Sequence, residues 1–176
     1  MDIFVEWLEE PVLNYEIIGH ILKMSLLCIV YVCIFCLAMS YFCPEYLDSL
    51  RNEDAADLLE QKGWIITLVL VLASVFEELT FRLLPIIFFS IFVDEVEIDW
   101  KLISVVIVSS VLFGVFHGSL NNIPLQGVLG VLFCIVFLKN GGLQKKYIRA
   151  TLASISVHLI YNVIVFVVAA VIKSSI

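Results

Sequence analysis

Charged side chains are scarce in this sequence. Asp, Glu, Lys and Arg make up only 15% of its 176 residues, whereas hydrophobic residues make up 62%. A soluble domain typically carries about 25% charged and about 45–50% apolar residues. The mean hydropathy of +1.08 agrees with this imbalance. The composition excludes an ordinary soluble domain and predicts a membrane protein.

Positively charged residues are especially few. The chain has 10 Lys and Arg residues and 17 Asp and Glu residues, and its formal net charge is −7. A chain this acidic has no overall electrostatic reason to bind nucleic acid or anionic lipid head groups. One basic cluster surrounds the Gly141-Gly142 pair, and we interpret it as a loop that orients the chain in the membrane. The positive-inside rule places this loop, residues 139–149, in the cytoplasm.

Several other features are absent. The 5 cysteines are an odd number, and the pair Cys33-x-x-Cys36 has no second pair that would complete a zinc site. We therefore expect buried hydrophobic cysteines and no disulfide framework. The N-terminus lacks the basic start of a cleavable signal peptide. No internal repeat or low-complexity segment is evident.

Long apolar stretches define the organisation of the chain. A helix needs about 20 apolar residues to cross the hydrocarbon core of a bilayer. We expect an interfacial segment at 1–18, a first span at 19–43, a polar amphipathic linker at 44–62 and a membrane core at 63–176. The core contains apolar stretches at 63–93, 101–117, 125–138 and 150–172. The prediction is an all-α polytopic bundle of five spans, or of six if Pro85 divides the second span.

Polar side chains interrupt these apolar spans at a few positions. An ionised side chain at the centre of a membrane helix costs about 2.5–3.5 kcal/mol on insertion scales. Such residues usually face a protein-lined cavity and are functional candidates. The set comprises Glu77, Glu78, Arg82, His117, His158 and Asn162. Because separate spans contribute them, we expect one shared polar site within the bilayer.

Helical spacing predicts different roles for the two adjacent glutamates. Glu78 and Arg82 are four residues apart, so they share a helix face and can form an ion pair. Glu77 points about 100° away from Glu78 and has no local cation. A carboxylate without a partner suits a general base. We therefore predict that Glu78 and Arg82 brace the site and that Glu77 is reactive.

The histidines and the asparagine supply the remaining chemistry. His158 and Asn162 are four residues apart and can both donate hydrogen bonds to one developing negative charge, as in an oxyanion hole. His117 ends the third span, with Phe113 one turn earlier on the same face. A histidine at that position can take a proton, orient a water molecule or bind a metal.

Three motifs together resemble the CPBP family of intramembrane proteases, which contains CAAX-prenyl proteases, bacteriocin-processing enzymes and abortive-infection proteins. They are Glu77-Glu78-x-x-x-Arg82, Phe113-x-x-x-His117 and His158-x-x-x-Asn162, within residues 64–172. The resemblance implies an intramembrane endopeptidase in which Glu77 is the catalytic base and His117 helps to orient the water. It also implies that His158 and Asn162 stabilise the oxyanion, with Glu78, Arg82 and Phe113 in support.

The resemblance carries further expectations about cofactors, partners and location. No cofactor is expected, since the chain lacks a HExxH pair; zinc is the alternative, held by Glu77, His117 and His158. The partner is a peptide or protein substrate at the lipid bilayer, and the location is the cell membrane, specifically a bacterial plasma membrane. A prenylated C-terminus and a leader peptide are both candidate substrates.

Two other functions fit the same residues. The first is a non-catalytic immunity or scaffold protein that retains the polar cluster for packing. The second is a small transporter in which buried Glu and His residues carry ions. The sequence leaves the oligomeric state open.

Overall fold

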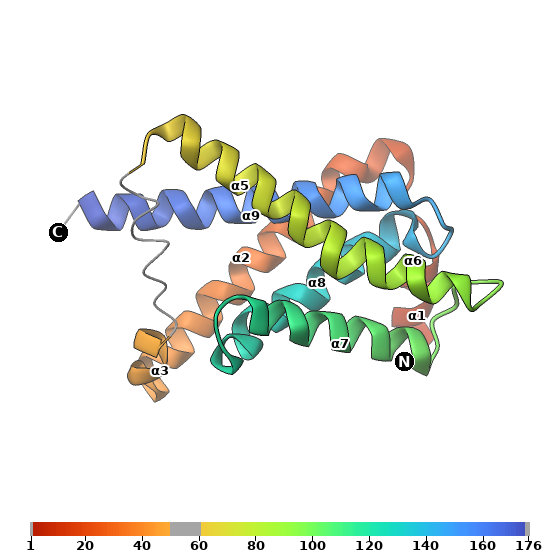
Figure 1. Cartoon of the computed structure of the whole chain (residues 1–176), viewed down its shortest axis with the longest axis horizontal. Coiled ribbons are helices and arrows are strands. Elements are labelled where there is room, and N and C mark those ends of the chain that lie inside the picture. Colours follow the sequence, from red (N-terminus) through yellow and green to blue (C-terminus); the bar gives the residue numbers. More distant parts are fainter. Residues whose placement is uncertain (1, 50–60, 175–176) are drawn as a thin grey trace.

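The computed structural model describes residues 2–49 and 61–174, and this part of the chain is helical, with no β-strands (Figure 1). The N-terminal elements are α1 (Asp2–Glu9), a 3₁₀ turn (Asn14–Glu16), α2 (Ile17–Phe42) and α3 (Pro44–Ser49). The second run comprises α5 (Gly63–Glu78), a π-helical turn η2 (Leu79–Leu83) and α6 (Leu84–Ile91). The remaining elements are α7 (Trp100–Phe116), η3 (Leu120–Asn122), η4 (Ile123–Gly127), α8 (Val128–Phe137), η5 (Leu138–Gly142) and α9 (Tyr147–Ser174).

The long helices lie side by side as a bundle, and the chain alternates between its two ends (Figure 1). Four helical runs are long and apolar enough to cross a membrane: Asn14–Phe42, Gly63–Ile91, Leu120–Gly142 and Tyr147–Val171. The apolar helix Trp100–Phe116 is shorter. The expectation of an all-α polytopic membrane protein is therefore confirmed.

The alternative of six spans is wrong, because Pro85 does not divide the second span. Gly63–Ile91 is one continuous helical run, and Pro85 lies in the first turn of α6. A proline inside an α-helix lacks an N–H and clashes with the carbonyl four residues earlier. The preceding turn is π-helical, and the Leu84 N–H bonds to the Leu79 carbonyl, five residues back. This wider turn accommodates the proline without breaking the helix.

Two hydrophobic clusters hold the bundle together. One lies around the polar residues of the site and contains Met24, Cys28, Phe81, Phe113, Leu129, Phe133, Val136, Ala153, Val157 and Tyr161. The other contains Leu8, Ile86, Val96, Leu102, Phe137, Leu138 and Ala150. The first cluster draws residues from α2, η2, α7, α8 and α9, so packing of distant segments determines where the polar side chains lie.

A close approach of α7 to the η4 turn depends on Gly114. A Cβ atom at this position would lie 2.9 Å from the Cα of Ile123, which real Cβ atoms essentially never show. Helix α7 ends at Phe116, His117 is its C-cap residue, and Gly118 follows with a φ of +119°. A residue with positive φ after a helix commonly terminates it. The glycine pattern thus positions His117 at the end of α7.

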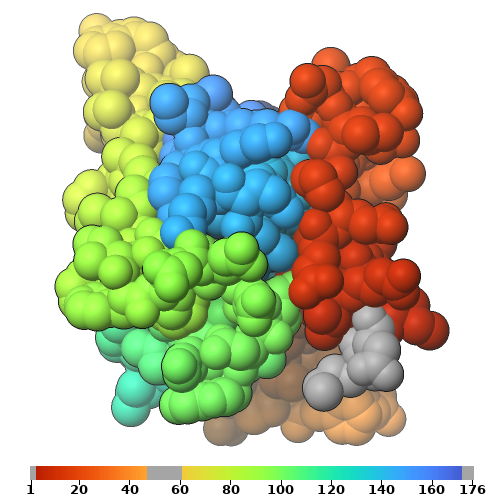
Figure 2. Space-filling model, turned by 90° about the vertical axis from the view of Figure 1, so that its right-hand side faces the viewer, coloured from red at the N-terminus to blue at the C-terminus, as the bar shows by residue number. Residues whose placement is uncertain are grey.

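The basic loop between α8 and α9 binds neighbouring segments of the chain. Lys139 is buried and donates to the carbonyl of Trp7, with its ammonium group 4.5 Å from the Trp7 ring centroid. Arg149 donates to the carbonyl of Val12 and to Asn14 Oδ1. Figure 2 shows the N-terminal segment (red) beside the region of this loop (blue). These contacts attach the predicted interfacial segment, residues 1–18, to the bundle.

Residues 44–62, predicted as an amphipathic linker, fall only partly within the described part of the chain. Pro44–Ser49 is helical, and residues 50–60 lie outside the described residues. All 5 cysteines are free thiols, so the expectation of no disulfide framework agrees with the structure.

Candidate active site

Glu77, His117 and His158 meet in space although they come from three different helices. Glu77 Oε2 lies 3.4 Å from His158 Nε2 and 3.7 Å from His117 Nε2. Both distances exceed that of an ordinary N–H···O hydrogen bond. The Glu77 side chain is 12% exposed and the His117 side chain 26% exposed. The three groups therefore face one another at the edge of the buried core, where His117 is the most exposed, while His158 is 2% exposed and the Glu77 Oε2 atom is itself buried.

Glu78 is held rigidly on the other side of His158. Its side chain is fully buried, and Oε1 lies 2.8 Å from His158 Nδ1. Ser154, one turn before His158 on α9, donates a hydrogen bond to Glu78 Oε2. Arg82 Nε lies 3.6 Å from the same oxygen. A buried carboxylate needs such partners, because an unpaired charge in the interior is strongly destabilising.

Arg82 lies between aromatic rings as well as beside Glu78. The guanidinium carbon is 4.1 Å from the Phe113 ring centroid and 5.2 Å from that of Phe133. Rings at these distances attract a cation through their electron-rich faces. The Glu78–Arg82 ion pair is present, but His158 and Ser154 are the closer partners of Glu78.

Both the ring and the backbone carbonyl of His117 are held by neighbouring residues. Its Nδ1 lies 2.8 Å from the carbonyl oxygen of Phe113, and its ring packs edge-on against the Phe113 ring, 4.4 Å between centroids. Asn122 donates to the His117 carbonyl at 2.8 Å. Since a carbonyl oxygen only accepts hydrogen bonds, the proton of the neutral imidazole resides on Nδ1 and Nε2 is an acceptor.

Asn162 lies one turn after His158 on α9, and its amide nitrogen donates to Ser74 Oγ at 3.1 Å. Ser74 is fully buried in α5, one turn before Glu78. The bond therefore ties α9 to the helix that carries both glutamates. The amide nitrogen has a second hydrogen beyond the one given to Ser74.

Sequence reasoning missed four residues that support this site. Ser74, Ser154 and Asn122 are small polar side chains, and Phe133 stacks on the His158 ring with 4.5 Å between centroids. Ser154 was the easiest to detect, because it stands four residues before His158 on the same helix face. Phe133 carries no pattern that distinguishes it from other core aromatic residues, since only the fold brings it to His158.

Among the residues that the structure describes, no group of three His, Cys, Asp or Glu side chains is arranged as a site for a metal ion. The set named for zinc, Glu77, His117 and His158, is not arranged as such a site.

The helices are long and apolar enough to cross a membrane, and a glutamate faces two histidines among them, which defines the general class as a multi-pass membrane protein with a buried polar site. A family model described as Type II CAAX prenyl endopeptidase Rce1-like matches residues 60–164. This match covers more than half of the chain, and the chain belongs to that family. No curated protein and no solved structure matched the chain significantly.

Family membership confirms the resemblance to the CPBP proteases. At the level of the family, the chain is an intramembrane endopeptidase, and its substrate is a membrane-associated protein. The matched region contains all the residues discussed for the site, from Ser74 to Asn162.

Proposed function

We propose that the chain hydrolyses a peptide bond by means of a water molecule activated by Glu77. The observation that carries this proposal is the position of Glu77 Oε2, 3.4 Å from His158 Nε2 and 3.7 Å from His117 Nε2. The 3.7 Å gap to His117 exceeds a direct hydrogen bond, and a water molecule can bridge polar groups at such a separation. The carboxylate is the general base of the reaction.

The tautomer of His117 supports the placement of that water. Because Nδ1 is committed to the Phe113 carbonyl, Nε2 accepts a hydrogen bond. A water between this nitrogen and Glu77 Oε2 gives one hydrogen to each, and its oxygen lone pair is free to attack a carbonyl carbon. Holding the nucleophile in this way lowers the entropic barrier of the reaction.

The reaction then follows from these positions. The water oxygen bonds to the scissile carbonyl carbon, one water proton passes to Glu77, and the carbonyl electrons become an oxyanion. As the intermediate collapses, the C–N bond breaks and Glu77 returns its proton to the leaving amine. The second water proton stays on the new carboxyl group, and no further reactant is needed.

His158 and Asn162 are the proposed donors to the oxyanion. His158 Nδ1 faces the Glu78 carboxylate at 2.8 Å, so the ring donates from Nε2 only in its doubly protonated form. The Asn162 amide holds Ser74 with one hydrogen and has a second for the oxyanion. Removing one oxyanion donor costs about 10²–10³ in kcat in a well-studied hydrolase.

We further propose that no metal or other cofactor takes part and that the enzyme resides in a bacterial plasma membrane. The family name points to a prenylated C-terminus as one substrate, while a leader peptide or another membrane-anchored peptide is the second candidate. The two classes are separated by offering a farnesylated peptide and its unprenylated counterpart to the same preparation.

The test compares peptide profiles of membranes that contain the wild type or Glu77→Gln. The expected result is a set of cleavage products that disappears in Glu77→Gln, while the variant remains inserted and folded. The matched control is Glu97→Gln, the same substitution at an exposed position in the loop before α7, and it retains the products. Full cleavage by Glu77→Gln refutes the assignment. A biological effect that survives without products favours the scaffold function, and ion-dependent flux without products favours a transporter.

A further inference from the structure

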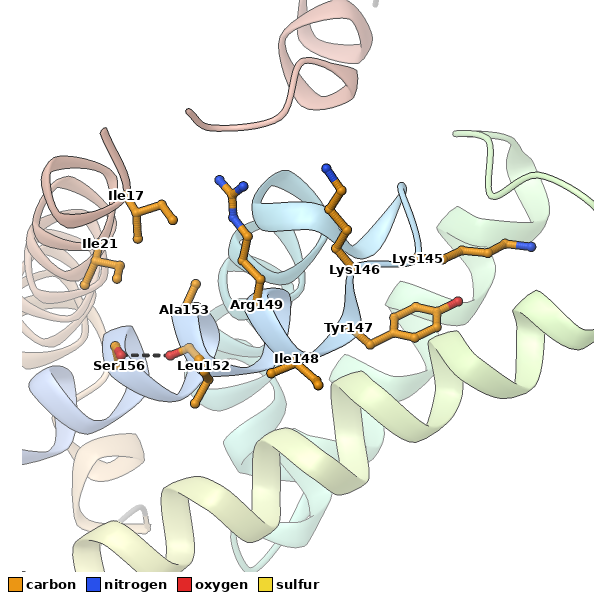
Figure 3. A pocket seen from close by; sticks show the side chains of 10 residues that line it. All are labelled: Ile17, Ile21, Lys145, Lys146, Tyr147, Ile148, Arg149, Leu152, Ala153 and Ser156. Atoms are coloured by element: carbon orange, nitrogen blue, oxygen red, sulfur yellow. Dashed lines mark hydrogen bonds between the residues drawn. The ribbon is translucent and has the colours of Figure 1, made fainter. Parts of the chain in front are cut away.

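A groove lies between the first turns of α2 and α9, on a part of the molecule that the proposed reaction does not use. It has a volume of about 850 Å³, within the range of about 300–1,000 Å³ typical of small-molecule sites. Figure 3 shows Ile17 and Ile21 of α2 on one side and Leu152 of α9 across from them. This apolar lining suits a hydrocarbon chain.

The rim of the groove is positively charged. Lys146, directly before α9, is exposed, and Arg149 lies in the first turn of α9. Figure 3 shows both side chains extending from the start of α9 in the same direction, while Lys145 points away. Lys145 binds the carbonyls of Val93 and Asp94. Lys146 and Arg149 are therefore the two cations that extend together at the rim, and the Arg149 guanidinium is also hydrogen-bonded to Val12 and Asn14.

No carboxylate balances these two charges within the groove. Its lining contains no Asp or Glu, whereas the two neighbouring hollows are lined by Glu10 with Glu16 and by Asp94 with other acidic residues. Among the described residues, the hydrogen-bond acceptors of Arg149 are uncharged: the Val12 carbonyl and Asn14 Oδ1. Within the described part of the chain, no carboxylate lies within 4.0 Å of either cation. The local charge is thus positive although the whole chain is acidic.

The position of the groove fits a membrane lipid. Ile17 and Tyr147 both stand at the start of membrane-spanning runs, and the starts of α2 and α9 lie at the same end of the bundle (Figure 1). Cations at the ends of spans lie near the level of lipid head groups, and the apolar residues continue from there into the hydrocarbon region. Basic pockets between membrane helices bind anionic head groups.

The groove is also separate from the active site. At about 100° per residue, Arg149 and Ser156 lie about 160–180° around α9 from His158. His158 faces Glu77 and Glu78, so Arg149 and Ser156 lie on the opposite face of the same helix, and Leu152 lies about 120° from His158. A molecule bound there contacts α9 without blocking access to Glu77.

We propose that this groove binds an anionic glycerophospholipid of the surrounding bilayer. Its phosphate lies against Lys146 and Arg149, and an acyl chain lies against Ile17, Ile21 and Leu152. The overall acidity of the chain argued against anionic lipids, but among the described residues no carboxylate forms an ion pair with either cation. The lipid connects α2, outside the family match, to the helix that carries His158.

The test measures lipid retention on the full chain purified in detergent. Phosphatidylglycerol and phosphatidylcholine with the same acyl chains are added in equal amounts, and bound lipid is counted by native mass spectrometry. Phosphatidylglycerol is expected to predominate. Because each basic residue near a head group favours anionic lipid, Lys146→Glu is expected to lower phosphatidylglycerol binding on the order of 10- to 30-fold.

Two further variants make the result decisive. Lys101→Glu is the matched control, since Lys101 is also an exposed lysine at the start of a helix, α7, but does not line the groove; it retains wild-type lipid binding. Ser156→Phe fills the groove and is expected to reduce binding of both lipids. If Lys146→Glu does not fold, Lys146→Gln takes its place as the test of the charge. Equal binding of the two lipids by the wild type overturns the proposal. Equal effects of Lys146→Glu and Lys101→Glu, or unchanged binding by Ser156→Phe, also overturn it.

Discussion

Glu77 and Glu78 are neighbours in the chain, and we predict opposite consequences when each is changed to glutamine. Glu77→Gln keeps the size of a side chain that is 12% exposed and removes only its ability to take a proton. Glu78→Gln removes a charge that is fully buried between His158, Ser154 and Arg82. The first change is expected to abolish activity in a folded protein, and the second to destabilise the fold itself.

The expected magnitudes follow from burial. Arg82 is 1% exposed, and removing its partner leaves an uncompensated cation, which costs about 3–5 kcal/mol in buried pairs. For a chain of this length, about 2–4 °C of Tm corresponds to 1 kcal/mol, so Glu78→Gln is expected to lower Tm by about 6–20 °C. Glu77→Gln is expected to change stability by less than about 1 kcal/mol and to lower kcat by at least about 10²–10⁴.

A thiol-reactive fluorescent dye measures Tm in this protein, because Cys28 and Cys134 are buried and become accessible on unfolding. The exposed thiols of Cys33 and Cys43 are first blocked with N-ethylmaleimide. Cleavage is measured on the same preparations by the peptide profile. A Glu78→Gln variant as stable as the wild type, or a Glu77→Gln variant that loses as much stability, refutes the division of roles between the two glutamates.

Three other predictions follow from the contacts around the site. Ser154→Ala removes a buried hydrogen bond to a carboxylate and is expected to cost about 1.5–3 kcal/mol in thermal unfolding, whereas Ser156→Ala on the same helix costs less than about 0.5 kcal/mol; equal losses contradict this account of Glu78. Asn162→Ala is expected to lower kcat about 10²–10³-fold with little change in KM, and steady-state kinetics that show only a raised KM would count against a role in the transition state. Treatment with 1,10-phenanthroline is expected to leave cleavage unchanged. If cleavage is lost on treatment and recovered when Zn²⁺ is added, the enzyme has a zinc site and the metal-free mechanism is wrong.

Periodicity and composition predicted the membrane class and the helical fold, because both depend on the local balance of apolar and polar residues. The polar side chains within the spans pointed to a site because each is costly in a bilayer unless it is used or paired. The family match over residues 60–164 supports the motif spacing from which the resemblance was drawn.

Local spacing was less informative about the details of the site. The assumption of uniform α-helix predicted Arg82 as the main partner of Glu78, whereas His158 and Ser154 from α9 are closer. It also allowed Pro85 to divide a span, because a π-helical turn cannot be recognised from the spacing of apolar residues. The first outcome depends on contacts between segments more than 70 residues apart, and the second depends on backbone geometry.

The order of residues alone determined that this chain enters a membrane and that a few charged and polar groups are placed in its helices, since hydropathy and helical spacing are local properties. Tertiary packing decided which of those groups meet. It places His158 between two carboxylates and brings Ser74 within hydrogen-bond distance of Asn162. It also brings Lys146 and Arg149 to a groove that no acidic side chain lines. The physical reason is that each of these relations joins helices distant in sequence, and close packing of the bundle sets their register.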